Sequence, residues 1–235
     1  AERRAAFLLS LADDLRQLGT PADIMRVTAG RLGEWIDASR VFYAEITGSR
    51  MTVERDRVRG VPSIVGEHSL EAFGPDLLRA YRPGAPVVVR HVETDERLGE
   101  VARAGLKARN VGAFIDVVLF QEEQWVGLLA VQSAAPRIWT SAEESLVQEV
   151  GERVRMAVER ARAEMDVRRM KDTLEQQVIE RTAELQRYHA IVDATTAPIC
   201  AFDTDFRLTA FNRAHNDEFR RVNGFDTKIG DVFPD

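Results

Sequence analysis

The stretch VGAFIDVVLFQEEQWVGLLAVQ, residues 111–132, decides the fold. It holds two runs of strand-forming apolar residues, 111–120 and 125–132, separated by a short polar segment. Two such runs so close together predict an antiparallel β-hairpin. Because the connecting residues 121–124 are polar and lack Asn-Gly, we expect a connection longer than a tight two-residue turn.

Two polar residues interrupt this apolar hairpin. Asp116 lies inside the first run and Gln132 ends the second. A polar side chain in an apolar strand needs a partner when it is buried, and a few polar groups among aromatic side chains are typical of small-molecule pockets. The hypothesis is therefore a ligand site lined by Phe73, Tyr81, Phe114, Asp116, Trp125 and Gln132. The alternative is plain core packing, with Asp116 facing solvent.

The segments around the hairpin alternate between helical and strand patterns. Apolar residues at helical spacing predict two helices over 5–36, with Thr20 as N-cap and Pro21 in the first position of the second helix. Strands are expected over 41–46, 51–58 and 87–89, and helices over 73–81 and 95–108. The pattern predicts an α+β fold in which helices flank an antiparallel sheet.

A long helix is predicted from Ser141 to about Asp193, because the stretch has no proline and a single glycine. Apolar residues step along it by three and four, and this phase slips between Met165 and Met170. The pattern is typical of a two-stranded coiled coil with irregular heptads, so we expect a parallel homodimer. A single solvated helix is the alternative. The expected interface consists of Val147, Val150, Val154, Ala157, Ala161, Leu174, Val178, Leu185, Tyr188 and Val192.

Composition limits the function classes. The 235 residues carry a net charge of −6, which argues against a nucleic-acid partner. The single cysteine argues against a disulfide framework and a cysteine-based zinc site. No run reaches the roughly 18–20 apolar residues of a membrane span, so we expect a cytoplasmic protein with no membrane partner. The N-terminus lacks Met, and we expect a piece of a longer chain.

Catalytic and cofactor motifs are not recognised. The sequence has no phosphate-binding loop and no GxGxxG, and the four histidines are far apart. His189 is expected on a helix surface, and Cys200 as a small buried thiol. We therefore expect no metal, no cofactor and no enzymatic activity in this part of the protein.

The last 40 residues predict the beginning of another domain. Short strands are expected over 199–202 and 208–211, then a helix over 213–222 and a last turn from Ile229 to Phe233. Two strands are too few to bury one face of a sheet by themselves.

Three parts of the chain resemble known signalling modules. Residues 38–46, 87–98, 111–132 and 135–144 resemble a GAF domain of bacterial sensor proteins. Residues 174–185 are similar to the coiled-coil linker of sensor histidine kinases, and 188–235 resemble the first half of a PAS domain. The implied domains are a GAF sensory domain over 1–145, a signalling helix over 146–190 and a truncated PAS domain over 191–235.

The resemblance implies the sensory input and dimerisation region of a signal-transduction protein of the two-component type, with its kinase domain elsewhere. An unidentified small molecule is the expected GAF ligand. One alternative is a structural dimerisation module with a filled, ligand-free GAF core. Another is a bilin or haem sensor, although residues 1–160 contain no cysteine for a thioether-linked bilin.

Overall fold

The computed structural model describes residues 2–232. The chain forms two compact units, residues 1–167 and 168–235. Helix α5 (Ser141–Ala194) begins in the first unit and ends in the second. Within the described residues, no helix combines the length and the apolar character needed to cross a bilayer.

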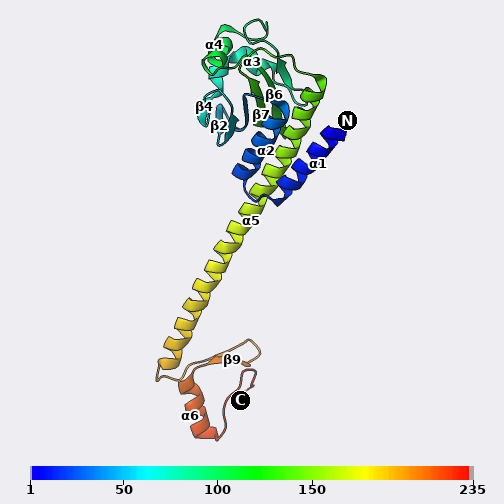
Figure 1. Ribbon diagram of the computed structural model, residues 1–235. Coiled ribbons are helices and arrows are strands. Elements are labelled where there is room, and N and C mark those ends of the chain that lie inside the picture. Colours follow the sequence, from blue (N-terminus) through cyan, green and yellow to red (C-terminus); the bar gives the residue numbers. More distant parts are fainter. Residues whose placement is uncertain (1, 233–235) are drawn as a thin grey trace. The chain divides into compact units, whose positions relative to one another are not determined.

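An antiparallel sheet forms the centre of the first unit (Figure 1). Its seven strands, counted over the described residues, run in the order β4-β2-β1-β7-β6-β5, and β3 pairs with β1. The pair β6–β7 is the hairpin predicted from residues 111–132. The strands are β1 (Arg40–Thr47), β2 (Arg50–Val53), β3 (Asp56–Val58), β4 (Gly66–Ser69), β5 (Val87–Val89), β6 (Ala113–Gln121) and β7 (Gln124–Ser133).

Helices cover both faces of this sheet, which confirms the predicted α+β class. One face packs against α1 (Glu2–Gln17), α2 (Pro21–Ile36) and the first part of α5. The other face is covered by a 3-10 turn η1 (Leu70–Phe73), α3 (Gly74–Ala80) and α4 (Glu100–Ala108). Thr20 caps α2 as predicted, because its hydroxyl accepts the backbone N–H of Asp23.

The turn of the β6–β7 hairpin is tighter than expected. Gln121 pairs with Gln124, so Glu122 and Glu123 alone make the connection. Both adopt positive φ, 47° and 65°, which is the backbone of a type I′ turn. The expectation of a longer loop was wrong, because packing on both faces of β6 and β7 sets the register and the turn residues accept the conformation that it demands.

The first half of α5 differs from the predicted dimer seam. Val147, Val150, Val154 and Ala161 are fully buried against the sheet and the helices of their own chain. Ala157 packs on the same core. These residues therefore fill the first unit and do not form a free surface. The reason is that an apolar stripe at helical spacing can pack against a sheet as well as against a second helix.

The second unit contains the predicted short elements. It comprises the end of α5, the antiparallel strands β8 (Cys200–Phe202) and β9 (Leu208–Phe211), and α6 (Arg213–Asn223). Cys200 is exposed, which corrects the expectation of a buried thiol, since all three residues of the short strand β8 are exposed. Phe233, in the expected last turn, lies outside the described residues.

Asn212 ties these elements together. Its carboxamide oxygen accepts the N–H groups of Ile199 and His215, at 2.8 and 3.0 Å. Its Nδ2 donates to the carbonyls of Val192 and Ala197, at 3.1 and 2.9 Å. One buried side chain thus joins the end of α5 to β8 and to the first turn of α6.

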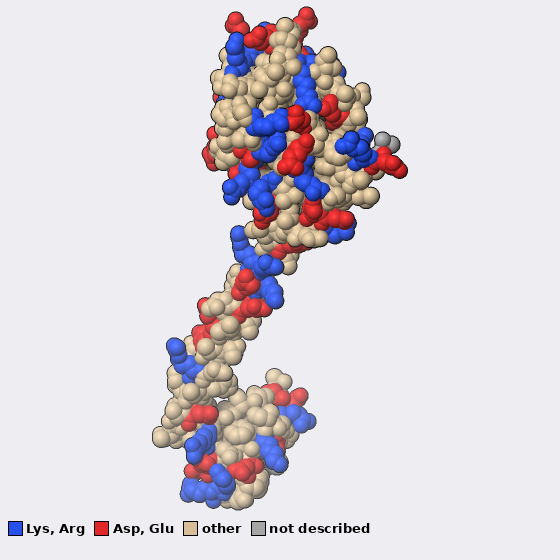
Figure 2. Space-filling model, viewed as in Figure 1, with Lys and Arg blue, Asp and Glu red and all other residues tan. Residues whose placement is uncertain are grey.

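Figure 2 shows basic and acidic side chains together on one face of the molecule. On the face of the first unit seen in Figure 2, basic and acidic side chains alternate over the helices. That face has no continuous basic stripe of the kind that follows a phosphate backbone.

The turn yields a stability prediction. Replacing Glu122 by Asn and Glu123 by Gly should raise the free energy of unfolding by about 1–2 kcal/mol, because Asn-Gly adopts positive φ at a lower cost. Chemical denaturation of the purified protein measures this. The control is the Glu122→Gln, Glu123→Gln pair, which removes the charges and keeps both side chains. Equal stability of the two pairs would show that charge, rather than backbone strain, governs the turn.

Candidate ligand-binding site

The candidate site lies between the sheet and the cover formed by η1, α3 and α4. Alternate residues of β6 point to opposite faces, so Phe114, Asp116 and Val118 point toward this cover. Asp116 is 5% exposed and does not face solvent, which excludes the alternative of an outward-facing carboxylate.

Asp116 is half-partnered. Its Oδ2 accepts a hydrogen bond of 2.6 Å from the Tyr81 hydroxyl. Its Oδ1 is buried and receives no hydrogen bond from any described residue. Burial raises the pKa of Asp116 to about 7, and the bond from Tyr81 lowers it only in part. Burial, followed by the nearby carboxylate, raises the pKa of Tyr81 well above its usual value.

Aromatic side chains form the wall beside this carboxyl. The rings of Tyr81 and Trp125 are 5.2 Å apart, and the indole N–H of Trp125 donates to the carbonyl of Gly127 at 2.8 Å. The cavity beside them measures about 20 Å³, room for one water molecule. Its lining is Phe42, Met51, Leu70, Phe73, Leu77, Leu78, Tyr81, Leu106, Asp116, Trp125, Leu128 and Gln132.

A buried arginine holds the other polar residue of the cavity. Arg40 is 1% exposed, and its Nη1 donates to Oε1 of Gln132 at 2.7 Å. The carbonyls of Pro62 and Arg109 accept its remaining bonds. Burial lowers the pKa of the Arg40 guanidinium. Because a guanidinium can only donate, the Gln132 oxygen faces Arg40 and the carboxamide Nε2 is the end left to donate elsewhere.

The structure brings together five of the six predicted site residues. Phe73, Tyr81, Asp116, Trp125 and Gln132 line one cavity. Phe114 is fully buried in the apolar cluster that contains Tyr81 and packs against Trp125, but it does not line the cavity. The sequence analysis did not predict a role for Arg40. Its only sign in the sequence is the position of a charged residue at the start of an apolar strand.

The opposite side of β6 contacts α5. Ile115, Val117 and Leu119 pack in the core that contains the first turns of this helix. The contact is close at Gly151, where an added Cβ would lie 3.0 Å from Cγ1 of Val117. A single strand thus separates the Asp116 cavity from α5.

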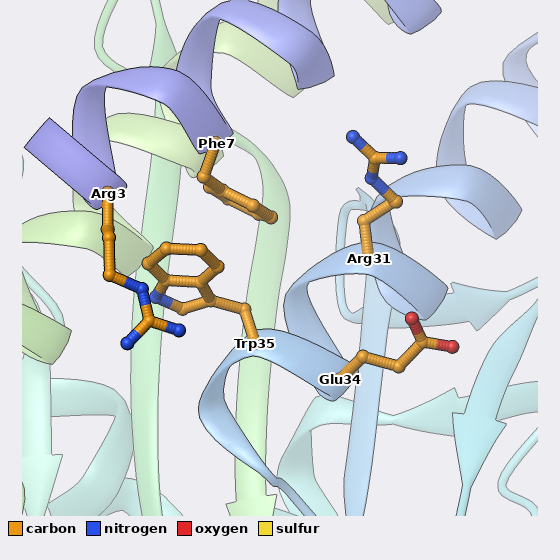
Figure 3. Close-up of a pocket in the computed structure, with 5 residues that line it drawn as sticks. All are labelled: Arg3, Phe7, Arg31, Glu34 and Trp35. Atoms are coloured by element: carbon orange, nitrogen blue, oxygen red, sulfur yellow. The ribbon is translucent and has the colours of Figure 1, made fainter.

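A second hollow lies on the surface between α1 and α2 (Figure 3). Its centre is Trp35, whose ring packs at a tilt against Phe7, with the centroids 4.7 Å apart, and lies under the guanidinium of Arg3 at 5.7 Å. Arg31, on its rim, already pairs with Asp14 at 3.3 Å. The hollow has no buried polar group in need of a partner among the described residues, so the Asp116 cavity is the better candidate.

Comparison with known proteins agrees with this architecture. The sequence matches the GAF domain family over residues 12–158. The chain belongs to the GAF domain family.

Among curated relatives of this GAF protein are two circadian input-output histidine kinases named CikA. The relative from Synechocystis sp. is 28% identical over 150 residues, which cover 61% of this chain and 19% of the relative. The relative from Thermosynechococcus vestitus is 21% identical over 206 residues, covering 82% of this chain and 28% of the relative. The chain therefore spans less than a third of either kinase.

Solved structures share the GAF fold at low sequence identity. The phycoerythrobilin-bound GAF domain of a cyanobacterial phytochrome superposes with a TM-score of 0.61 at 15% identity, over 69% of this chain and 97% of that one. Free methionine-R-sulfoxide reductase from Neisseria meningitidis, solved with its substrate, superposes with a TM-score of 0.55 at 14% identity. The match covers 69% of this chain and 94% of the reductase. At such identities the likeness concerns the fold alone.

The raised pKa of Asp116 makes the stability of the GAF domain depend on pH. The folded state keeps the proton up to about pH 7, whereas an unfolded Asp loses it near 3.8, so stability falls as pH rises through this window. Asp116→Asn has no proton to lose. Its free energy of unfolding should therefore rise relative to wild type by up to about 4 kcal/mol between pH 4 and pH 8.

Urea denaturation at several pH values measures this difference. Asp166→Asn, which alters an exposed carboxyl on α5, is the matched control and should show no such trend. A difference between Asp116→Asn and wild type that stays constant with pH would contradict the raised pKa.

Proposed function

We propose that this chain is the sensory input region of a signal-transduction protein of the histidine-kinase class, and that a small molecule bound in the Asp116 cavity is its signal. The observation that carries the proposal is the two-sided role of β6. One face of the strand holds the half-partnered carboxyl, and the other face packs on α5. A ligand that moves β6 therefore acts on the helix.

The mechanism is a shift between two arrangements of β6 and α5. A ligand stabilises the arrangement to which it binds more tightly, and the population follows its differential affinity. The narrow contact between Gly151 and Val117 makes α5 sensitive to small displacements of the strand, because close-packed side chains transmit a displacement instead of absorbing it. The helix then carries the change out of the GAF domain.

Dimerisation would turn this change into an output. Beyond the GAF core, α5 exposes the apolar side chains Leu174, Val178, Leu185, Tyr188 and Val192, and both leucines are 60% exposed. Their spacing fits a parallel coiled coil with a second copy. Two helices that pack along this stripe can change register or crossing angle together.

The relatives support the placement in a kinase pathway. Both CikA proteins are named histidine kinases, and the chain matches a small part of each. We propose that phosphotransfer belongs to other parts of the parent protein, that this region is cytoplasmic, and that β8, β9 and α6 begin a PAS domain.

A second candidate function is a bilin-based photosensor, since bilin-bound GAF domains are among the structural neighbours. The only cysteine is Cys200, in the second unit, so a bilin in the Asp116 cavity would be held without a thioether from the GAF domain. A visible absorption band in the purified protein separates this candidate from the colourless sensor proposed above.

The coupling across β6 is tested by filling the cavity without a ligand. Leu106 lines the cavity, so Leu106→Phe should press on the sheet and change the hydrogen-exchange protection of α5 amides in residues 146–158 by about tenfold or more. Val101→Phe places the same ring on the exposed side of α4 and is the control. Identical α5 protection in both variants would contradict the proposed route.

The dimer is tested by light scattering. Wild type should have about twice the mass of one 26.4 kDa chain. Leu174→Asp with Leu185→Asp should give a monomer, because like charges would face each other across the seam. Gln176→Asp with Ala183→Asp adds the same charge on the opposite side of the helix and should remain dimeric. A wild-type monomer at micromolar concentration would overturn the dimer.

A further inference from the structure

We infer that the Asp116 cavity selects a small organic cation that carries N–H groups, such as a protonated amine, amidine or guanidine. The inference rests on the proposed function, since it names the class of ligand for the same cavity. It adds that Asp116 is the counter-ion and that the surrounding aromatic rings hold the body of the ligand.

The first step is the unsatisfied oxygen. Oδ1 of Asp116 is buried without a hydrogen-bond donor among the described residues, while the Tyr81 hydroxyl serves only Oδ2. A buried carboxylate oxygen without a donor is costly to keep. An N–H group of a ligand satisfies it directly.

The second step is the charge. Ionised Asp116 places a negative charge in a desolvated site, and its direct partner, Tyr81, is neutral. A neutral ligand would satisfy the hydrogen bond and leave the charge uncompensated. A cationic N–H group supplies the hydrogen bond and also compensates the charge. Such charge-assisted hydrogen bonds are stronger than neutral ones.

The third step is the wall of the cavity. Tyr81 and Trp125 line it beside Asp116, and faces of aromatic rings attract cations. The ring of Phe73, which also lines the cavity, already carries a cation, because the guanidinium of Arg109 lies 5.7 Å from its centre. An anionic ligand would meet a carboxylate and the negative faces of these rings. The aromatic wall therefore favours a cation over an anion, as Asp116 does.

The fourth step concerns orientation. Arg40 engages the oxygen of Gln132, so the carboxamide can offer N–H groups only from Nε2. The fitting ligand carries its cationic group toward Asp116, and Nε2 of Gln132 can additionally bind an acceptor on a larger ligand. Because the cavity has room for about one water, such a ligand must also displace the cover formed by η1 and α3.

Binding should follow the ionisation of Asp116. Tyr81, after α3, bonds Asp116 directly, whereas Arg40 on β1 and Arg109 after α4 hold their guanidinium groups on Gln132 and on backbone carbonyls. Cation affinity should fall as the pH drops below about 7, approaching tenfold per pH unit, since only the ionised carboxylate pairs with the ligand.

The experiment is isothermal titration calorimetry at pH 8 with two matched pairs of ligands. Benzamidinium is compared with benzamide, and methylguanidinium with methylurea; the members of each pair share a shape and differ in charge. We expect at least one cation to bind tenfold or more tightly than its neutral partner. Asp116→Asn should remove this preference, and Asp166→Asn should retain it.

Folding of each variant is checked by its thermal transition, and Tyr81→Phe, which keeps the carboxyl, should retain the preference for the cation. Neutral ligands that bind as well as the cations, cations that bind Asp116→Asn unchanged, or a wild type that binds neither cation would each overturn the inference. Failure of the proposed sensory function gives a different result. In that case Leu106→Phe would leave the hydrogen-exchange protection of the α5 amides unchanged, whichever ligand binds.

Discussion

The structure depends on strand β6, whose two faces belong to two separate cores. The side chains of a strand alternate between its two faces, so neighbouring residues of β6 serve two separate cores. Asp116 belongs to the core under η1, α3 and α4, and Val117 belongs to the core that holds α5. The two cores share a backbone and are covered by different helices. Any displacement of this strand by one core is therefore felt by the other.

The carboxyl on this strand is costly for the fold. An apolar residue of similar size at position 116 would avoid the desolvation that raises the pKa of Asp116 to about 7. A strongly shifted pKa in a cavity is more common at functional sites than in purely structural cores. Tyr81 satisfies one oxygen only, and the arrangement resembles a site in which the last partner is supplied by a ligand.

The sequence predicted the β6–β7 hairpin and most of the residues that line the cavity, because polar residues in apolar strands and aromatic residues in nearby segments leave a visible pattern. Arg40 was missed, since its role depends on Gln132 across the β1–β7 pairing, and pairing between distant strands is not visible in a single sequence. The turn at Glu122 and Glu123 was also missed. There, tertiary packing imposed a backbone conformation that the residues themselves do not favour.

Helix α5 shows why an apolar stripe alone cannot identify its partner. Its first turns use the stripe inside the GAF domain, and the last buried residue is Ala161. The phase of the stripe slips just beyond, between Met165 and Met170, where the side chains become exposed. Packing on a sheet follows the natural period of 3.6 residues, whereas a coiled coil needs 3.5. A slip at this point allows a single helix to satisfy the sheet first and to present a new stripe afterwards. The irregularity therefore marks the place where the helix leaves the GAF core.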